Sequence, residues 1–176
     1  FQQAIGSLKS HKLATSRHAS FKSDLKQSAL QFISQRTSVS GETIVAGFPW
    51  FGDWGRDTMI ALPGICLVTK EFETAKVILE TFAKYCKEGR LPNKFPDHDL
   101  DDLKYNSLDA SLWYFYAIQK YIEYTNDLPW VINRLLPVLE DIIQHHINGL
   151  DDDIFVDDLG LLHGGSESTQ LTWMDV

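Results

Sequence analysis

Helical spacing of apolar residues, repeated in successive segments, is the feature that most limits the folds open to this chain. The spacing predicts helices at about residues 57–69, 71–87, 106–125 and 127–148. Short links join the first to the second and the third to the fourth, while a longer loop separates the two pairs. Strands and helices do not alternate, which disfavours a parallel sheet. The pattern therefore predicts an all-α chain of antiparallel helical hairpins, stacked side by side.

The helix expected at residues 106–125 carries two apolar stripes. One contains Leu108, Leu112, Phe115, Ile118 and Ile122, and the other contains Trp113, Tyr116, Ala117, Tyr121 and Tyr124. A helix that is apolar over so much of its circumference is buried on more than one side, so Trp113 is assigned to the core. We expect Gly89 to stop the preceding helix, and Asp127 with Pro129 to open the next one.

A further helix is expected at residues 21–36, with Ser20 as its N-cap. The β-branched residues 43–45 predict a short extended piece after it. Pro63 lies inside the segment 57–69, so that helix is expected either to be distorted in its first turns or to begin later.

Length, charge and cysteine content narrow the class of protein. A chain of 176 residues has the size of one domain and can bury a core. Its net charge of −8 and the lack of a basic stripe argue against nucleic acid as a partner. No apolar run reaches the length that spans a bilayer, so no membrane partner is expected. Cys66 and Cys86 lack CxxC spacing and are expected to be reduced core residues. We expect a cytoplasmic protein.

Residues 1–19 are weakly patterned, polar and basic, and are interpreted as a lead-in to one domain at residues 20–176. The chain begins at Phe1 without a Met and stops directly after an aromatic and acidic motif. We therefore expect it to be a piece of a longer protein.

Aromatic and charged residues gather between residues 47 and 63. The aromatic ones are Phe48, Trp50, Phe51 and Trp54, and the charged ones are Asp53, Arg56 and Asp57. The glycines and the proline among them predict a loop. Aromatic rings can cover the apolar C–H face of a pyranose, while a guanidinium and a carboxylate bind its hydroxyls. The stretch is therefore a candidate sugar site.

Ordinary structural roles are the alternative for the same residues. Asp57 could cap a helix, Arg56 could be its ion partner, and the tryptophans could belong to the core. Similarly, Asn106 could be a helix N-cap with Asp109 three residues later, as in a capping box. Composition leaves both interpretations open.

The loop at residues 90–105 is rich in aspartate but does not fit a calcium loop. Its acids are Asp97, Asp99, Asp101 and Asp102. The EF-hand pattern needs a glycine where Asp102 stands and a glutamate where Leu108 stands. His145 and His146, being adjacent on a helix, point about 100° apart and are not expected to share a metal. No metal site and no cofactor are expected.

Three segments that are distant in sequence are expected to meet at one end of the helices. The longer loops fall on alternate links, which places them on the same side of a stack of hairpins. These segments are residues 50–57 (WFGDWGRD), 93–109 and 170–175 (QLTWMD). Their convergence is stronger support for a site than any one segment.

Four motifs also carry a family resemblance. In chain order they are GFPWFGDWGRDTMIALPG, LPNKFPD, YNSLDASLW and QLTWMD. They resemble the C-terminal amylo-α-1,6-glucosidase domain of glycogen debranching enzymes, and the likeness runs from about residue 24 to the end. The resemblance implies an (α/α)₆ toroid, a ring of six helical hairpins, of which residues 20–176 hold about the first half, truncated at the C-terminus and with short β-like segments in loops.

The resemblance implies inverting hydrolysis of an α-1,6-linked glucosyl stub on glycogen or a limit dextrin. Asp175 then corresponds to the general acid, and the implied substrate-binding residues are Trp50, Asp53, Trp54, Arg56, Asp57, Asn106, Asp109 and Trp173. The tryptophans would form pocket walls, and Arg56 with Asp57 would clamp the far edge of the glucose.

The general base is not recognised in this chain. We expect the chain alone to be inactive or nearly so, because an inverting site needs both carboxyl groups. Helix faces exposed by truncation are expected to favour self-association. The alternatives are another (α/α)₆ sugar enzyme (a glucoamylase, a trehalase or a sugar phosphorylase) or a non-catalytic carbohydrate-binding module.

Overall fold

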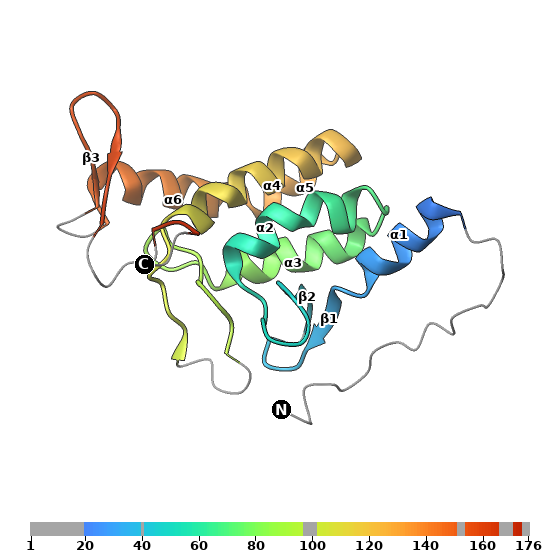
Figure 1. Ribbon diagram of the computed structural model, residues 1–176. Helices are drawn as coiled ribbons and strands as arrows, with labels where there is room; N and C mark the ends of the chain where they lie inside the picture. Colours follow the sequence, from blue (N-terminus) through green and yellow to red (C-terminus); the bar gives the residue numbers. More distant parts are fainter. Residues whose placement is uncertain (1–19, 40, 97–101, 151–153, 166–170, 174–176) are drawn as a thin grey trace.

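The computed structural model describes residues 20–39, 41–96, 102–150, 154–165 and 171–173 (Figure 1). The helices of this part are α1 (Phe21–Leu30), α2 (Gly55–Leu62), α3 (Phe72–Lys84), α4 (Asp109–Thr125), α5 (Leu128–Arg134) and α6 (Leu136–Asn148), with a π-helical segment, η1 (Pro63–Leu67), continuing α2. The strands form two small antiparallel hairpins, β1 (Ile33–Arg36) with β2 (Gly41–Ile44), and β3 (Phe155–Val156) with β4 (Leu162–His163). The chain is therefore mostly helical, as predicted.

The core lies where α2, α3 and α4 pack together. Helix α4 contacts α2, η1, α3 and α5, so it is packed on several sides, but Leu112, Tyr116 and Tyr124 of its two predicted stripes are exposed. The fully buried side chains of these helices include Met59, Leu62, Ile78, Leu79, Phe82, Tyr114, Ala117 and Tyr121. Figure 1 shows the three helices side by side, with α5 and α6 along α4. The toroid itself stays a prediction.

The predicted helix at residues 21–36 is too long. Ser20 is its N-cap, as expected, because its hydroxyl accepts from the Ser23 amide. The helix ends at Leu30, and the chain then pairs as β1 against β2, with Ser34 opposite Thr43. Strand β2 confirms an extended segment near residues 43–45. The hairpin is favoured over a longer helix because it places Phe32 and Ile33 against the core, whereas α1 has no buried residue.

Pro63 distorts its helix, but not at the start. Helix α2 begins at Gly55, two residues before the predicted position. Proline has no backbone N–H to donate within a helix, and η1 begins at this residue. Beyond it the Val68 amide donates to the Pro63 carbonyl at 3.0 Å, five residues back, which is the π-helical pattern.

Gly89 lies in the turn that follows α3, rather than at the last residue of the helix. Its φ is +71°, and a Cβ there would stand 2.5 Å from the Cβ of His145. Only glycine fits both constraints without a shift of α6. The turn is closed by backbone hydrogen bonds between Lys87 and Arg90.

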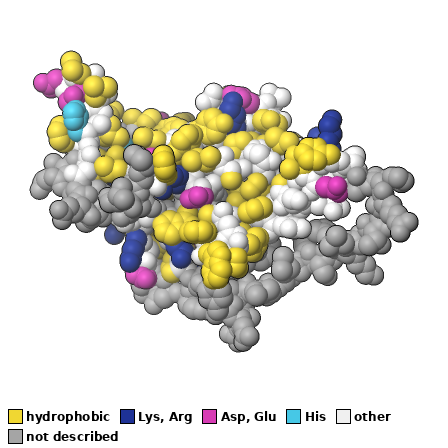
Figure 2. Space-filling view, viewed as in Figure 1, with side chains coloured by type: hydrophobic (Ala, Val, Ile, Leu, Met, Phe, Trp, Pro, Cys, Tyr) yellow, Lys and Arg dark blue, Asp and Glu magenta, His cyan; other side chains and the backbone are white. Residues whose placement is uncertain are grey.

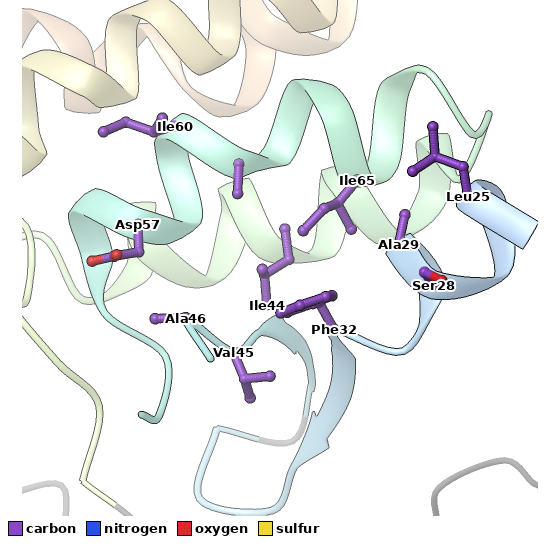
Figure 3. A pocket seen from close by; sticks show the side chains of 11 residues that line it. Leu25, Ser28, Ala29, Phe32, Ile44, Val45, Ala46, Asp57, Ile60 and Ile65 are labelled. Carbon is purple, nitrogen blue, oxygen red and sulfur yellow. The ribbon is translucent and has the colours of Figure 1, made fainter. Parts of the chain in front are cut away.

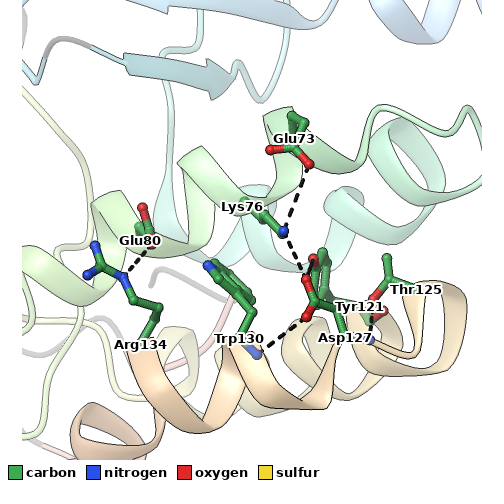
Figure 4. A network of polar contacts seen from close by, with 8 residues as sticks. All are labelled: Glu73, Lys76, Glu80, Tyr121, Thr125, Asp127, Trp130 and Arg134. Carbon is green, nitrogen blue, oxygen red and sulfur yellow. Dashed lines mark hydrogen bonds and ion pairs between the residues drawn. The ribbon is translucent and has the colours of Figure 1, made fainter.

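The predicted helix at residues 127–148 is divided into α5 and α6, which meet at Leu135 just before Pro137. Asp127 is the N-cap of α5, as expected, and accepts from the Trp130 amide. Figure 4 shows how this cap joins three helices. Lys76 of α3 contacts the Asp127 carboxylate at 2.9 Å, and Tyr121 of α4 donates to it at 3.2 Å. The ends of α3, α4 and α5 are therefore fixed together.

The two cysteines are not joined by a disulfide. Cys66 and Cys86 are free thiols, and burial raises the pKa of each to about 12. No group of three potential metal ligands occurs among the described residues; Asp97, Asp99 and Asp101 lie outside them. Within the same described ranges no helix combines the length and apolarity needed to cross a membrane.

His146 gives a pH-dependent contribution to stability. Its side chain is buried, Nδ1 lies 2.8 Å from the Ile142 carbonyl, and Nε2 has no hydrogen-bond partner among the described residues. Burial lowers the pKa of this imidazole, with Arg90 and His145 acting in the same direction. The unfolded chain therefore takes up the proton first as the pH falls.

We expect the free energy of unfolding to decrease as the pH falls below about 6.5, the ordinary histidine pKa, with a slope of at most about 1.4 kcal/mol per pH unit from this group. Urea unfolding at pH 7.5 and 5.5, in the wild type and in His146→Leu, measures it. The loss at pH 5.5 should be smaller in the variant, which cannot take up the proton. An equal loss in both proteins would contradict the assignment.

Candidate functional site

The aromatic loop is a tight hairpin with its rings in solvent. The Phe51 amide donates to the Gly47 carbonyl, and the Ala46 amide donates to the Gly52 carbonyl, both at 2.8 Å. Phe48 and Trp50 lie at the tip, within the loop that the Gly47–Phe51 bond closes. Trp50 is 79% exposed, and Phe51 is 59% exposed. The loop prediction is confirmed, and these rings are not core residues.

Trp54 follows the loop and is half-buried beside the loop at residues 90–105. The Lys94 ammonium lies 5.6 Å from the centre of its ring, and the two residues form a β-bridge. The next amide, of Gly55, donates to the Asn93 carbonyl at 2.9 Å. A Cβ at Gly55 would stand 2.5 Å from the Pro92 carbonyl oxygen. Glycine is therefore required here for the two loops to approach each other.

Arg56 pairs with Asp109, not with Asp57. Its Nε lies 2.9 Å and 2.8 Å from the two carboxylate oxygens of Asp109, and its side chain is 8% exposed. Ser107 donates to the same carboxylate at 3.2 Å. The structure thus rejects the alternative in which Asp57 is the ion partner of Arg56. The pair joins the first turn of α2 to the first turn of α4.

Asn106 is not a helix cap, so the capping-box alternative is wrong. Helix α4 begins at Asp109, its N-cap position is Leu108, and no side chain caps it. The Asn106 amide oxygen instead accepts from Asn93 Nδ2 at 3.0 Å, across the loop. The Asp109 carboxylate binds Arg56, so it does not make the reciprocal bond that a capping box would need.

Asp53 lies beneath the loop rather than on its surface. Its carboxylate is fully buried, receives a bidentate contact from Arg36, and accepts from the Thr43 hydroxyl at 3.0 Å. Burial raises the pKa of Asp53, and the adjacent Arg36 opposes that shift. No oxygen of the side chain reaches solvent in this structure, so the placement favours a supporting role, and the expected contact of Asp53 with sugar stays a prediction.

Asp57 has different surroundings from its neighbour Arg56, as adjacent helical residues do. It is exposed on the first turn of α2, at the margin of a pocket of about 410 Å³ (Figure 3). The rest of that pocket is mainly apolar, with Leu25 and Ala29 of α1 near Ile65, and Ile60 farther along the helix. The polar groups of the aromatic loop do not line it. Asp57 and Arg56 therefore have different surroundings in this structure, and their joint contact with a glucose stays a prediction.

The C-terminal motif reaches the same end of the helices. The Asp109 amide donates to the Leu171 carbonyl at 3.1 Å, and Trp173 is 74% exposed. Figure 1 shows the first turns of α2 and α4 at the end where residues 171–173 lie. The predicted convergence is therefore confirmed for the described parts of the three segments. Asp175 lies outside the described residues.

Exposed apolar side chains are also found away from the loops. On α2 and α4 they include Ile60, Leu112 and Tyr116, between 38% and 46% exposed. Figure 2 shows apolar atoms spread widely over the face in view. These exposed side chains could support self-association, which stays a prediction.

Exposed indoles, a buried arginine–carboxylate pair and two asparagines thus lie at one end of the packed helices. The chain belongs to the amylo-alpha-1,6-glucosidase family, whose family model matches residues 27–176. It is 27% identical, over 213 aligned residues, to the glycogen debranching enzyme of Saccharomyces cerevisiae. That alignment covers 88% of this chain but spans only 14% of the length of the yeast enzyme.

Proposed function

We propose that this chain supplies one side of the sugar site of an inverting glucosidase that removes α-1,6-linked glucose from branch points of glycogen or a related glucan. The observation that carries the proposal is the Arg56–Asp109 pair, placed beside the exposed aromatic loop at the end where the C-terminal motif arrives. Family membership agrees with that reaction class. The setting we favour is a cytoplasmic, glycogen-degrading enzyme.

The walls of the site come from its aromatic residues. Trp50 and Trp173 are exposed enough to lie against a glucose ring, and Trp54, half-buried beside Lys94, can contribute the exposed part of its ring. Asn106 can bind a hydroxyl with its amide nitrogen, since its oxygen is held by Asn93. Arg56 and Asp109 fix the floor between these groups, and Asp57 contributes from the edge.

The chemistry needs two carboxyl groups about 6.5–9.5 Å apart, with a water between one of them and the anomeric carbon. In this proposal Asp175 protonates the glycosidic oxygen as the C–O bond breaks. A carboxylate from outside this chain takes a proton from the water, whose oxygen attacks from the opposite face of the ring. The glucose released is then the β-anomer. Neither a metal nor a cofactor enters these steps.

The decisive experiment compares the isolated chain with the parent protein, defined here as the longest natural form that contains residues 1–176. We expect the parent protein to release β-glucose from an α-1,6-branched dextrin, and the isolated chain to be slower by about 10²–10⁴-fold because it lacks the base. Proton NMR of the first product gives both the rate and the anomer. A linear α-1,4-glucan is the control substrate.

Other outcomes separate the alternatives. Release of glucose 1-phosphate only when phosphate is present would show that the reaction is phosphorolysis and not hydrolysis. Dextrin binding without any product would indicate a binding module. α-Glucose as the first product would contradict inversion, and full turnover by the isolated chain would contradict the need for an outside base.

A further inference from the structure

Arg36 lies at the end of β1, where it contacts two separate loops of the candidate site. Its Nε donates to Asp53 Oδ2 at 2.5 Å, and its Nη2 contacts the second carboxylate oxygen. Its third nitrogen, Nη1, donates to the carbonyl of Pro96 at 3.2 Å. Asp53 belongs to the segment of Trp50 and Trp54, whereas Pro96 belongs to the loop of Asn93 and Lys94. One guanidinium therefore joins both loops.

The surroundings of Arg36 make this contact specific. Its side chain is 10% exposed, and the Asp53 side chain is not exposed at all. Thr43 donates to the carboxylate from the opposite strand, and Ser38 donates to the Pro96 carbonyl at 3.3 Å. A planar guanidinium can hold a carboxylate with two nitrogens and a carbonyl with the third, whereas a lysine ammonium cannot reproduce that fork.

The contact lies directly beneath the groups proposed to bind sugar. Asp53 precedes Trp54, and Gly55 then donates to the Asn93 carbonyl at 2.9 Å. Asn93 in turn holds Asn106. A movement of either loop would therefore shift an indole wall and a hydroxyl-binding amide relative to each other.

We propose that Arg36 is a positioning residue that holds the aromatic loop and the 90–105 loop in register, and thereby sets the spacing of the sugar site. Asp53 is its counterpart in the aromatic loop and acts from beneath it. The part of this inference that concerns sugar rests on the proposed function. The part that concerns the two loops does not depend on it.

Hydrogen exchange in the parent protein tests the loops directly. The reporters are the amides of Phe51, Gly55 and Asn93, each bonded to a backbone carbonyl at 2.8–2.9 Å. In Arg36→Lys and Arg36→Gln we expect them to exchange at least about tenfold faster, while amides inside α3 and α4 keep their protection, because local opening is separable from global unfolding. Arg134→Lys is the matched control, since Arg134 binds Glu80 at 2.8 Å on an exposed surface.

Kinetics on the branched dextrin give the second measurement. We expect kcat/KM to fall by about 10–100-fold in Arg36→Lys, mainly through KM, because misplaced binding groups weaken substrate capture. Ser38→Ala removes one bond to Pro96 but keeps the guanidinium, so its effect should be much smaller. Arg134→Lys should match the wild type.

Each other outcome overturns the inference. Unchanged exchange of the three reporter amides would show that Arg36 does not hold the loops. Faster exchange with unchanged KM and kcat would show that the loops do not set the site. Equal acceleration in α3 and α4 would reduce Arg36 to a general stability role. If the wild-type parent protein is inactive on dextrin, the proposed function fails, and the exchange measurement alone decides the role of Arg36.

Discussion

Asp109→Leu is expected to lower the free energy of unfolding by about 3–5 kcal/mol, because breaking a largely buried ion pair by removing one partner is strongly destabilising. The Arg56 side chain, 8% exposed, loses a carboxylate that lies 2.8 Å from its Nε. The hydroxyl of Ser107 loses an acceptor as well. Urea unfolding followed by far-UV circular dichroism at pH 7.5 measures the change.

Glu80→Leu is a matched control for this prediction. Glu80 contacts Arg134 through the same 2.8 Å Nε–oxygen distance, but the two side chains are 37% and 61% exposed. Its loss should cost less than about 1 kcal/mol, as for surface ion pairs in general. Restoring part of the stability with Arg56→Met added to Asp109→Leu would assign the cost to the buried guanidinium that has lost this carboxylate. Equal costs for Asp109→Leu and Glu80→Leu would contradict the buried-pair interpretation.

The same pair illustrates what the sequence could not predict. Arg56 and Asp57 are neighbours in sequence, and local reasoning paired them. The carboxylate that Arg56 contacts is instead 53 positions away, at the start of another helix. A pairing of this kind depends on how α2 packs against α4, and no local spacing encodes it. Arg36 was missed for the same reason: residues 21–36 were predicted as one helix, whereas α1 ends at Leu30 and Arg36 belongs to β1.

Features encoded by local spacing were predicted well. The Asp127 cap follows from a side chain that bonds the nearby backbone. The stripes of α4 were predicted only in part, since Leu112 and Tyr116 are exposed and the buried Tyr114 belongs to neither stripe. The aromatic loop follows from its glycines and proline. Alternating long and short links were enough to predict that the loops meet at one end, because antiparallel helices place alternate connections together. The burial of Asp53 depended on tertiary contacts and was not foreseen.

These contacts separate the residues that can meet a ligand from the residues that support the loops. Exposed Trp50 and Trp173 face solvent and can meet a ligand, whereas Asp53 is buried against Arg36 and supports the loop. The proposed reaction class rests on family membership, and the contacts give different surroundings to residues that the sequence grouped together.

In the parent protein, Asp175→Asn is expected to lower kcat on an α-1,6-branched dextrin by about 10²–10⁴-fold, the usual contribution of a general acid or base. The amide has nearly the same size as the acid but has no acidic proton to give to the leaving glycosidic oxygen. The limb of the pH–rate profile that reports deprotonation of the acid should disappear in the variant. Initial rates of glucose release between pH 4 and 8 measure both effects.

A substrate that needs no protonation separates this chemical role from a structural one. Fluoride leaves α-glucosyl fluoride without a proton from the enzyme, so Asp175→Asn should retain far more of its activity on this substrate than on the dextrin, if the missing step is proton donation. Asp158→Asn, which changes an exposed acid between β3 and β4, is the control and should behave as the wild type on both substrates. Equal losses on the fluoride and the dextrin would assign Asp175 to binding or folding, and unchanged rates on both would remove it from the mechanism. Only a selective loss on the dextrin agrees with a proton delivered from the C-terminal motif to the bond that breaks.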